Sequence, residues 1–261
     1  MNFFDCFMYH DEDLILDIRL NTLNDQVKKF VIIEAKLDHQ GNDKKLNFQI
    51  ENFKKFKDKI IYKVIDSFPK NQTNWERENF QRDFILKGLD SALEDDYIII
   101  SDVDEIPNLL NLKNIQNYRY TVFEQKMFYY KINLLNRTHP VWFGSKMCKK
   151  KYLKSPQWLR NQKVKKYSFW KFYKIKWNLV SNGGWHFSFL MTPQRIQQKI
   201  KSFAHAEFNK SNFISLDKIS NSIEKGIDIF DRNMNYQKIN FDNSFPSYIL
   251  NNKDKFKDWI L

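Results

Sequence analysis

The segment YIIISDVDEIP at residues 97–107 decides the fold more than any other stretch of this 261-residue chain. Its first five residues, Tyr97 to Ser101, are mostly apolar, which favours a short buried strand of a parallel sheet. Two carboxylates, Asp102 and Asp104, come directly after that strand. In open α/β sheets, ligands bind beyond the carboxyl ends of the strands. The segment therefore predicts a strand that delivers two acidic side chains to a ligand site.

Other segments on either side of this strand extend the pattern. Apolar runs predict two further strands, and apolar residues at helical spacing predict two helices, capped by Asp11 or Asp13 and by Asn74. The predicted strands cover residues 30–35 and 60–65, and the predicted helices cover 11–27 and 74–93. Strands and helices in this order favour an α/β fold with a central, mainly parallel sheet flanked by helices.

The second half of the chain is more aromatic and less regular. It predicts strands over 121–127 and 128–134 and helices over 195–203 and 214–230. Neither an internal repeat nor a long linker interrupts residues 1–261. We therefore expect a single domain with two functional halves, about 1–130 and about 131–261.

Glycine is scarce, and this excludes several enzyme classes. The six glycines cannot form a G-x-G-x-x-G, a G-x-x-x-x-G-K-[ST] or a G-x-S-x-G pattern. Dinucleotide-binding dehydrogenases, P-loop nucleotidases and α/β-hydrolases are thus poor candidates. The adjacent Gly183 and Gly184 predict a turn where the backbone approaches a ligand closely.

The two cysteines and the N-terminus bear on location. Cys6 and Cys148 lack the spacing of a metal site, and reduced thiols are the simpler interpretation. No signal peptide is recognisable, and no window approaches the roughly 20 apolar residues of a membrane span. We expect a soluble, cytoplasmic protein, with peripheral contact to a membrane surface left open.

The net charge of +12 is unevenly distributed. Residues 1–130 hold 18 basic and 23 acidic residues, whereas residues 131–261 hold 25 basic and 8 acidic ones. The stretch 131–180 contains 14 basic residues, no acidic residue and four tryptophans. Such a stretch is typical either of a polyanion- or membrane-surface-binding module without catalysis or of an ordinary solvated surface over an aromatic core. It contains no recognisable nucleic-acid-binding motif.

The Asp102-Val103-Asp104 tripeptide has two interpretations of its own. Paired carboxylates can hold Mg²⁺ or Mn²⁺, which in turn binds a diphosphate and neutralises a phosphate leaving group. Alternatively, the acids form a solvated turn and cap the helix after Pro107. The position after a buried strand strengthens the metal interpretation, and both interpretations stay open.

Several longer motifs carry a resemblance to a known family. Taken in chain order, the sequence resembles glycosyltransferase family 17 in the segments Asp5-Cys6-Phe7, Asp17-Ile18-Arg19-Leu20-Asn21, 30–34, Trp75 to Arg82, Ile100 to Pro107, Gly184 to Ser188 and Ser202 to Phe208. The resemblance implies a GT-A type fold and an inverting, metal-dependent N-acetylglucosaminyltransferase. It also implies a nucleotide sugar, with UDP-GlcNAc the expected donor, and Mn²⁺ or Mg²⁺ as cofactor.

By motif, the resemblance assigns Asp102 and Asp104 to the metal and the donor. It gives His186 as a third metal or diphosphate contact, with a hydrogen-bonded core histidine as the alternative. Arg77 and Arg82 lie five positions apart on one predicted helix, so they cannot face the site equally. Arg82 is the favoured donor contact, against a surface pair with Glu78.

Two roles are less defined by the sequence. Glu34, at the end of a predicted strand, is a candidate for contact with uracil or ribose. An inverting transferase also needs a base for the acceptor hydroxyl, and Glu105, Glu124 and Glu207 are the candidates. We expect a glycan or glycolipid acceptor, with acidic character suggested by the basic second half, and no nucleic acid.

Overall fold

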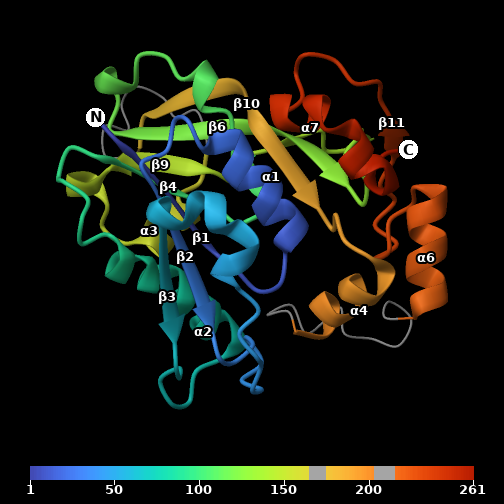
Figure 1. The fold of residues 1–261 in the computed structure, drawn as a ribbon, viewed down its shortest axis with the longest axis horizontal. Helices are drawn as coiled ribbons and strands as arrows, with labels where there is room; N and C mark the ends of the chain where they lie inside the picture. The colour runs from blue at the N-terminus through green and yellow to red at the C-terminus, as the bar shows by residue number, and fades with distance from the viewer. Residues whose placement is uncertain (165–174, 203–214) are drawn as a thin grey trace.

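The computed structural model describes residues 1–164, 175–202 and 215–261, whose strands form one large mixed β-sheet (Figure 1). The main path of the sheet runs β11-β7-β6-β9-β4-β1-β2-β3; β10 pairs with β6 and β5, and β8 pairs with β6. The strands are β1 Phe3–Met8, β2 Lys29–Ala35, β3 Ile60–Ile65, β4 Tyr97–Ile100, β5 Glu105–Pro107, β6 Tyr120–Tyr129, β7 Leu134–Asn136, β8 Val141–Trp142, β9 Lys146–Lys149, β10 Trp177–Ser188 and β11 Tyr236–Lys238.

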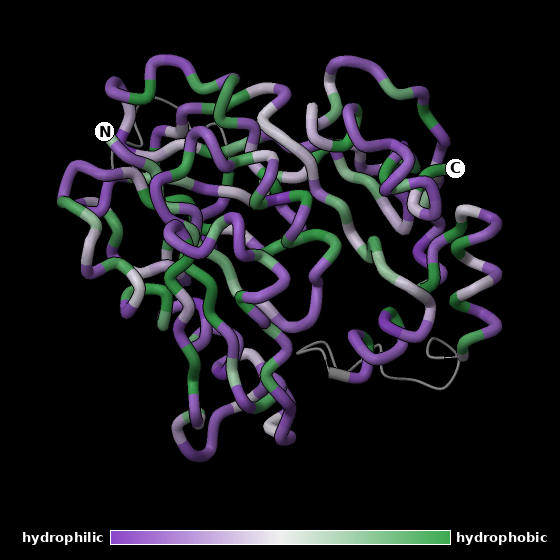
Figure 2. The backbone as a smooth tube through the Cα atoms, viewed as in Figure 1, coloured by the Kyte–Doolittle hydropathy of each residue, from purple (hydrophilic) through white to green (hydrophobic). Residues whose placement is uncertain are grey.

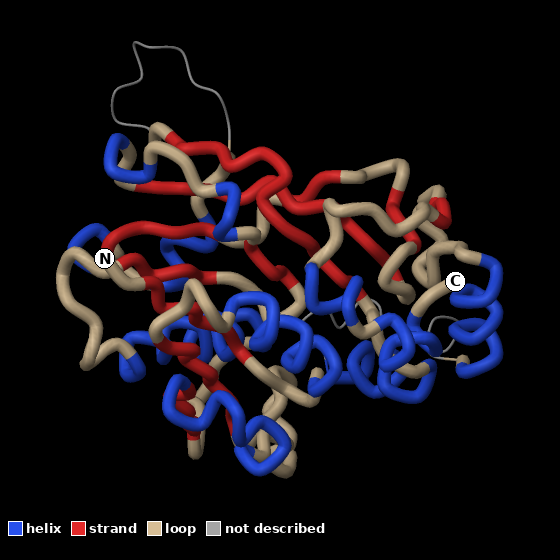
Figure 3. Tube along the Cα trace, turned by 45° about the horizontal axis from the view of Figure 1, so that its top comes forward, coloured by secondary structure: helices blue, strands red, loops and turns tan. Residues whose placement is uncertain are grey.

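Helices pack against this sheet, and Figure 3 shows most of them gathered along one side of the strands. The α-helices are α1 Asp13–Leu23, α2 Asn74–Asp83, α3 Pro156–Asn161, α4 Pro193–Ser202, α6 Leu216–Lys225 and α7 Ser247–Asn251. The 3₁₀ helices are η1 Ile50–Lys59, η2 Phe84–Gly88, η3 Leu109–Asn111, η4 Ile115–Asn117, η5 Lys150–Tyr152 and η7 Lys253–Trp259. None of the described helices is long and apolar enough to cross a bilayer.

The N-terminal half supplies the parallel part of the sheet. β1 lies between β2 and β4, β2 also pairs with β3, and all three pairings are parallel. Successive side chains of a strand point to opposite faces, and both faces of these strands are covered by apolar clusters. Continuous apolar runs are the consequence, and Figure 2 shows the buried strands as largely hydrophobic. The predicted strands at 30–35, 60–65 and 97–101 are confirmed, the last of them ending one residue earlier, at Ile100.

The C-terminal half makes the sheet mixed rather than mainly parallel. β9 pairs antiparallel with both β4 and β6, whereas β10 runs parallel to β6. β6 covers all of the predicted strand at 121–127 but only residues 128 and 129 of the one predicted at 128–134, and the next strand, β7, begins at Leu134. The structure thus confirms an α/β fold with helices around a large sheet, in which antiparallel pairings of the second half join the expected parallel ones.

Gly183 and Gly184 lie within β10 and not in a turn at a ligand. Gly184 has a φ of +139°, and a Cβ there would lie 2.1 Å from the carbonyl oxygen of Ile106. The register between β10 and β6 also shifts between Val180 and Gly184. The glycines therefore allow strands to approach one another closely, which corrects the sequence-based expectation.

The helix caps differ from the predicted ones by one residue each. α2 begins with a capping box in which Thr73, rather than Asn74, accepts a hydrogen bond from the Glu76 N–H. α1 has Glu12 at its N-cap, and the Glu12 carboxylate accepts from the N–H groups of His10 and Asp11. The Glu76 carboxylate accepts from the N–H of the α2 N-cap, whereas the Glu12 carboxylate accepts from two residues that precede α1.

Arg19 of α1 forms the central polar network of the fold. Its guanidinium makes a bidentate ion pair with Asp5 of β1, with N–O distances of 2.6 and 2.7 Å. It also donates to the carbonyl oxygens of Asp102, Val103 and Glu105 at 2.8–3.1 Å. The side chains of Arg19 and Asp5 are fully buried. One arginine therefore fixes the loop after β4 against the first strand and the first helix.

We predict that Arg19→Leu lowers the free energy of unfolding by about 3–5 kcal/mol, because it leaves the buried Asp5 carboxylate unpaired. Denaturant unfolding followed by circular dichroism measures the change. Lys54→Ala, which removes an exposed pair with Glu51, is the matched control and should have little effect. Equal stability of the Arg19→Leu variant and the unmodified protein would contradict this role.

Candidate functional site

A cavity of about 850 Å³ lies at the carboxyl ends of β1, β2 and β4. The segments after β1 and β2 line one end of it with His10, Asp38 and His39. Asp102 and Asp104, which come after β4, also line the cavity, as do side chains of α2, α3, β8, β10 and α4. The cavity therefore lies where ligands bind in sheets of this kind.

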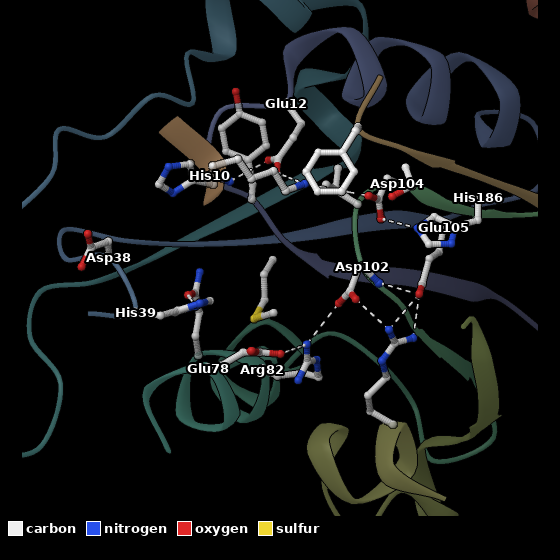
Figure 4. Close-up of a pocket in the computed structure, with 18 of the residues that line it drawn as sticks. His10, Glu12, Asp38, His39, Glu78, Arg82, Asp102, Asp104, Glu105 and His186 are labelled. Carbon is white, nitrogen blue, oxygen red and sulfur yellow. Dashed lines mark hydrogen bonds and ion pairs between the residues drawn. The ribbon is translucent and has the colours of Figure 1, made fainter. Parts of the chain in front are cut away.

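Asp102 is held between two arginines. Its Oδ1 lies 3.1 Å from a guanidinium nitrogen of Arg82, and its Oδ2 lies 2.7 Å from one of Arg160. Figure 4 shows Asp102 and Arg82 pointing toward one another. Burial raises the pKa of the Asp102 carboxyl, but the charges of Arg160 and Arg82 outweigh that effect and hold the pKa well below its usual range. Asp102 is thus an anion throughout the neutral range.

Glu105 is bound on all sides. Arg160 donates to both of its oxygens at 2.6 and 2.7 Å, Trp142 donates its indole N–H at 2.5 Å, and the Asp102 N–H donates at 2.9 Å. A Cβ at Gly144 would lie 2.2 Å from the Glu105 carboxylate, so only glycine permits this approach. Glu105 is only 1% exposed. It positions Arg160 and Trp142, and its geometry offers no open face for a reacting hydroxyl.

Asp104 points to the other side of the loop, toward His186 of β10 (Figure 4). His186 Nε2 lies 3.5 Å from one Asp104 oxygen, and Lys199 Nζ of α4 lies 3.9 Å from the other. Burial lowers the pKa of the His186 imidazole, but the neighbouring carboxylates, Asp104 first, raise it above its ordinary value. Burial raises the pKa of Asp104, and His186 and Lys199 lower it by more. The three groups form a compact polar corner.

The potential metal-ligand atoms of this corner, an Asp104 oxygen and the His186 Nε2, suit a divalent cation that has two protein ligands. A carboxylate oxygen and an imidazole nitrogen 3.5 Å apart can both reach one ion, and phosphate oxygens of a ligand would complete its coordination. No group of three or more His, Cys, Asp and Glu side chains with metal-site geometry occurs in the described ranges. Because both oxygens of Asp102 face guanidinium groups, Asp104 and His186 fit the ion better than the Asp102–Asp104 pair does.

The remaining predicted residues lie in different places. Arg82 lines the cavity and is 3% exposed, whereas Arg77 donates to the His39 carbonyl and does not line it. Glu34 is fully buried and accepts from the N–H groups of Asn47 and Phe48, so it holds a loop and does not reach the cavity.

The candidate bases are not brought together. Glu105 lines the cavity but is bound as described, and Glu124 of β6 does not line it. Glu207 lies outside the described residues, as does most of its motif at 202–208. The catalytic base is therefore not assigned to any of the three.

The cavity residues that had no role assigned from the sequence include Arg160, Lys199 and Trp142. Each belongs to a segment distant in sequence from the Asp102–Asp104 loop. The sequence indicated these residues only through the abundance of basic and aromatic residues in the second half. That abundance does not specify which of the basic and aromatic residues approach the site.

Several described cations of the basic stretch 131–180 bind acidic side chains or carbonyl oxygens of the same molecule. Lys149 and Lys151 pair with Asp95, and Lys150 donates to the Ala92 carbonyl. Arg160 belongs to the cavity wall. These bonds favour a stabilising role for the described cations over a continuous polyanion-binding surface. Residues 165–174 of the stretch lie outside the description.

Comparison with known proteins identifies the class. The sequence model of glycosyltransferase family 17 matches residues 1–260, and the chain therefore belongs to that family. Similar relatives are the β-1,4-mannosyl-glycoprotein 4-β-N-acetylglucosaminyltransferases of rat and human, each 26% identical over 232 residues. The mouse protein of the same name is 27% identical over 226 residues. The alignments cover 76% of this chain and 42% of each relative, so the chain spans less than half the length of these proteins.

A buried lysine beneath the site gives a pH prediction. Lys146 is 5% exposed and donates to the carbonyls of Arg160 and Gln162. Burial, followed by the charge of Arg160, lowers the pKa of its ammonium group to about 8. Between pH 8 and the higher pKa of the unfolded state, the unfolded chain binds more protons than the folded one, so the stability contribution of Lys146 rises with pH.

We therefore predict that the unfolding free energy of the unmodified protein, minus that of Lys146→Met, increases by about 1 kcal/mol per pH unit above about pH 8. Denaturant unfolding of both proteins at about pH 7, 8, 9 and 10 measures this difference. Taking the difference cancels other titrating groups. A difference that stays constant with pH would contradict a depressed pKa for Lys146.

Proposed function

We propose that this protein is an inverting, metal-dependent glycosyltransferase that moves GlcNAc from UDP-GlcNAc onto a hydroxyl group of a glycan or glycolipid, and that its fold is of the GT-A type. The observation that carries the proposal is the corner formed by Asp104, His186 and Lys199 in a large cavity at the carboxyl ends of parallel strands. Membership of glycosyltransferase family 17 supports the reaction class.

The nucleotide of the donor is assigned to the cavity end beyond β1 and β2. Nucleotides bind beyond the carboxyl ends of the strands in comparable sheets. His39 lies there, and its Nε2 is 2.8 Å from the Gln81 side chain of α2. Gln81 in turn donates to the Ile33 carbonyl of β2, so the wall at this end is fixed by polar contacts. A planar uracil and a ribose have preformed partners in such a wall.

The diphosphate of the donor is assigned to the corner beside Asp104. Asp104 and His186 would hold Mn²⁺ or Mg²⁺, which when bound neutralises charge on a phosphate leaving group. Arg82, Arg160 and Lys199 line the same cavity and add positive charge near that position. Arg82 and Arg160 are already fixed by Asp102, so their charges are oriented before a ligand arrives.

Inversion requires an acceptor hydroxyl that attacks the sugar from the face opposite the leaving group, with a base to receive its proton. Glu105 does not suit that role, because four donors already occupy its carboxylate. We propose instead that Glu105 positions Arg160. The acceptor side is assigned to the β6–β8–β10 end of the cavity, opposite β1 and β2 in the strand order.

We predict that Asp104→Asn lowers the rate of UDP release from UDP-GlcNAc roughly 100-fold or more, because a neutral amide would hold the divalent cation that neutralises the leaving group far more weakly than the carboxylate. Asp102→Asn should cause a smaller loss, roughly tenfold, because Asp102 acts by orienting two arginines. A coupled assay for UDP in the presence of Mn²⁺ measures both rates.

Glu51→Gln serves as the control, since Glu51 is an exposed residue of η1 that pairs with Lys54. Its rate should match that of the unmodified protein. If Asp104→Asn released UDP as fast as this control, the proposed corner would be wrong.

A further inference from the structure

Trp142 is the most exposed aromatic side chain on the β6–β8–β10 side of the cavity. It lies in β8, which pairs antiparallel with β6, and its register partner is Gln125. The residue is 39% exposed and lines the cavity together with Glu105 and His186. An exposed tryptophan costs solvation free energy, so a ligand that covers its ring gains free energy on binding.

The ring of Trp142 is held in one orientation. Its indole N–H donates to the buried Glu105 carboxylate at 2.5 Å, which fixes one edge of the ring. Its centroid lies 5.4 Å from that of His186 at an interplanar angle of 41°. Because β8 is paired to β6, the backbone is also fixed. A preformed aromatic surface loses little entropy when a ligand stacks on it.

The position of this surface distinguishes donor from acceptor. The nucleotide end lies beyond β1 and β2, on one side of β4 in the sheet, whereas β6, β8 and β10 lie on the other side. Asp104, which comes after β4, stands between the two ends, and it lies next to His186, which belongs to β10 on the acceptor side. A group stacked on Trp142 therefore lies next to the proposed reacting corner and away from the proposed nucleotide end.

From this geometry we propose that Trp142 binds the acceptor by stacking against the apolar C–H face of its terminal pyranose ring. A pyranose presents several axial C–H groups on one face and hydroxyls around its edge, and an aromatic ring packs against the former. The stacked ring would leave its edge hydroxyls free to point toward the corner beside Asp104. The inference rests on the proposed function for naming the ring an acceptor, but the stacking contact can be tested without catalysis.

The test is saturation-transfer-difference NMR on the full chain with methyl glycosides of mannose, glucose, galactose and GlcNAc, in the presence of UDP and Mg²⁺, which is diamagnetic and does not broaden the ligand signals. The protein is expected to transfer saturation most strongly to the axial protons of one ring face of at least one glycoside. Trp142→Ala should weaken glycoside binding roughly tenfold, and Trp142→Phe should retain most of it because a ring remains.

Val141→Ala is the matched control. Val141 is the neighbouring residue of β8, has the same 39% exposure, points to the opposite face of the strand and does not line the cavity. Its glycoside binding should equal that of the unmodified protein. Thermal unfolding of each variant verifies that it is folded.

Several results would overturn the proposal. These are the absence of saturation transfer to every glycoside, equal binding by Trp142→Ala and the unmodified protein, or a loss in Trp142→Phe as large as in Trp142→Ala. The last result would show that Trp142 acts only by its hydrogen bond to Glu105. The uracil protons of UDP are observed in the same samples, so failure of nucleotide binding, which concerns the proposed function, is seen separately from failure of glycoside stacking.

Discussion

The buried ion pair between Arg19 and Asp5 is the constraint on which the rest of the site depends. Two charges in a protein interior are tolerated only when their remaining hydrogen-bonding capacity is satisfied. Arg19 satisfies its own by donating to the backbone carbonyls of Asp102, Val103 and Glu105. The loop after β4 therefore has these carbonyls turned inward toward Arg19. Its carboxylates at 102 and 104 line the cavity, where they meet the arginines of α2 and α3 and the histidine of β10.

Much of this arrangement could be predicted from the sequence, for a physical reason. Strands buried on both faces are continuously apolar, so β2, β3 and β4 are visible as runs, and the loop after β4 must lie at a sheet edge where ligands bind. β1 was harder to predict because Asp5 interrupts its apolar pattern, and only its pairing with Arg19 makes that carboxylate acceptable in the core. The C-terminal strands could not be ordered, because β9 inserts between β4 and β6 through pairings that no local periodicity specifies.

Some of the site residues could likewise be predicted from local sequence patterns, and others could not. Asp102, Asp104, Arg82 and His186 line one cavity. The first three come after or belong to elements with a strong local pattern, whereas His186 belongs to β10, which no local pattern predicted and to which only the motif at 184–188 pointed. Glu34 shows the opposite outcome. Its carboxylate also stands at a strand end, but it accepts hydrogen bonds from the backbone N–H groups of a neighbouring loop and does not reach the cavity. Arg160 and Trp142 illustrate a third case. Their contacts with Glu105 depend on Gly144, which lets the backbone between β8 and β9 approach the carboxylate. This approach is a tertiary contact that no local sequence pattern specifies.

The structure shows where the excess positive charge of the second half lies. The described cations of the second half mainly neutralise carboxylates or cap carbonyls, and Arg160 and Lys199 place positive charge in the cavity wall. The central claim is that this wall binds the diphosphate of a nucleotide sugar. Isothermal titration calorimetry with UDP-GlcNAc, with and without Mn²⁺, tests it most directly. The account predicts saturable binding that strengthens with Mn²⁺ and is lost in Asp104→Asn. Absence of binding to UDP-GlcNAc and to every other UDP- or GDP-sugar would contradict it.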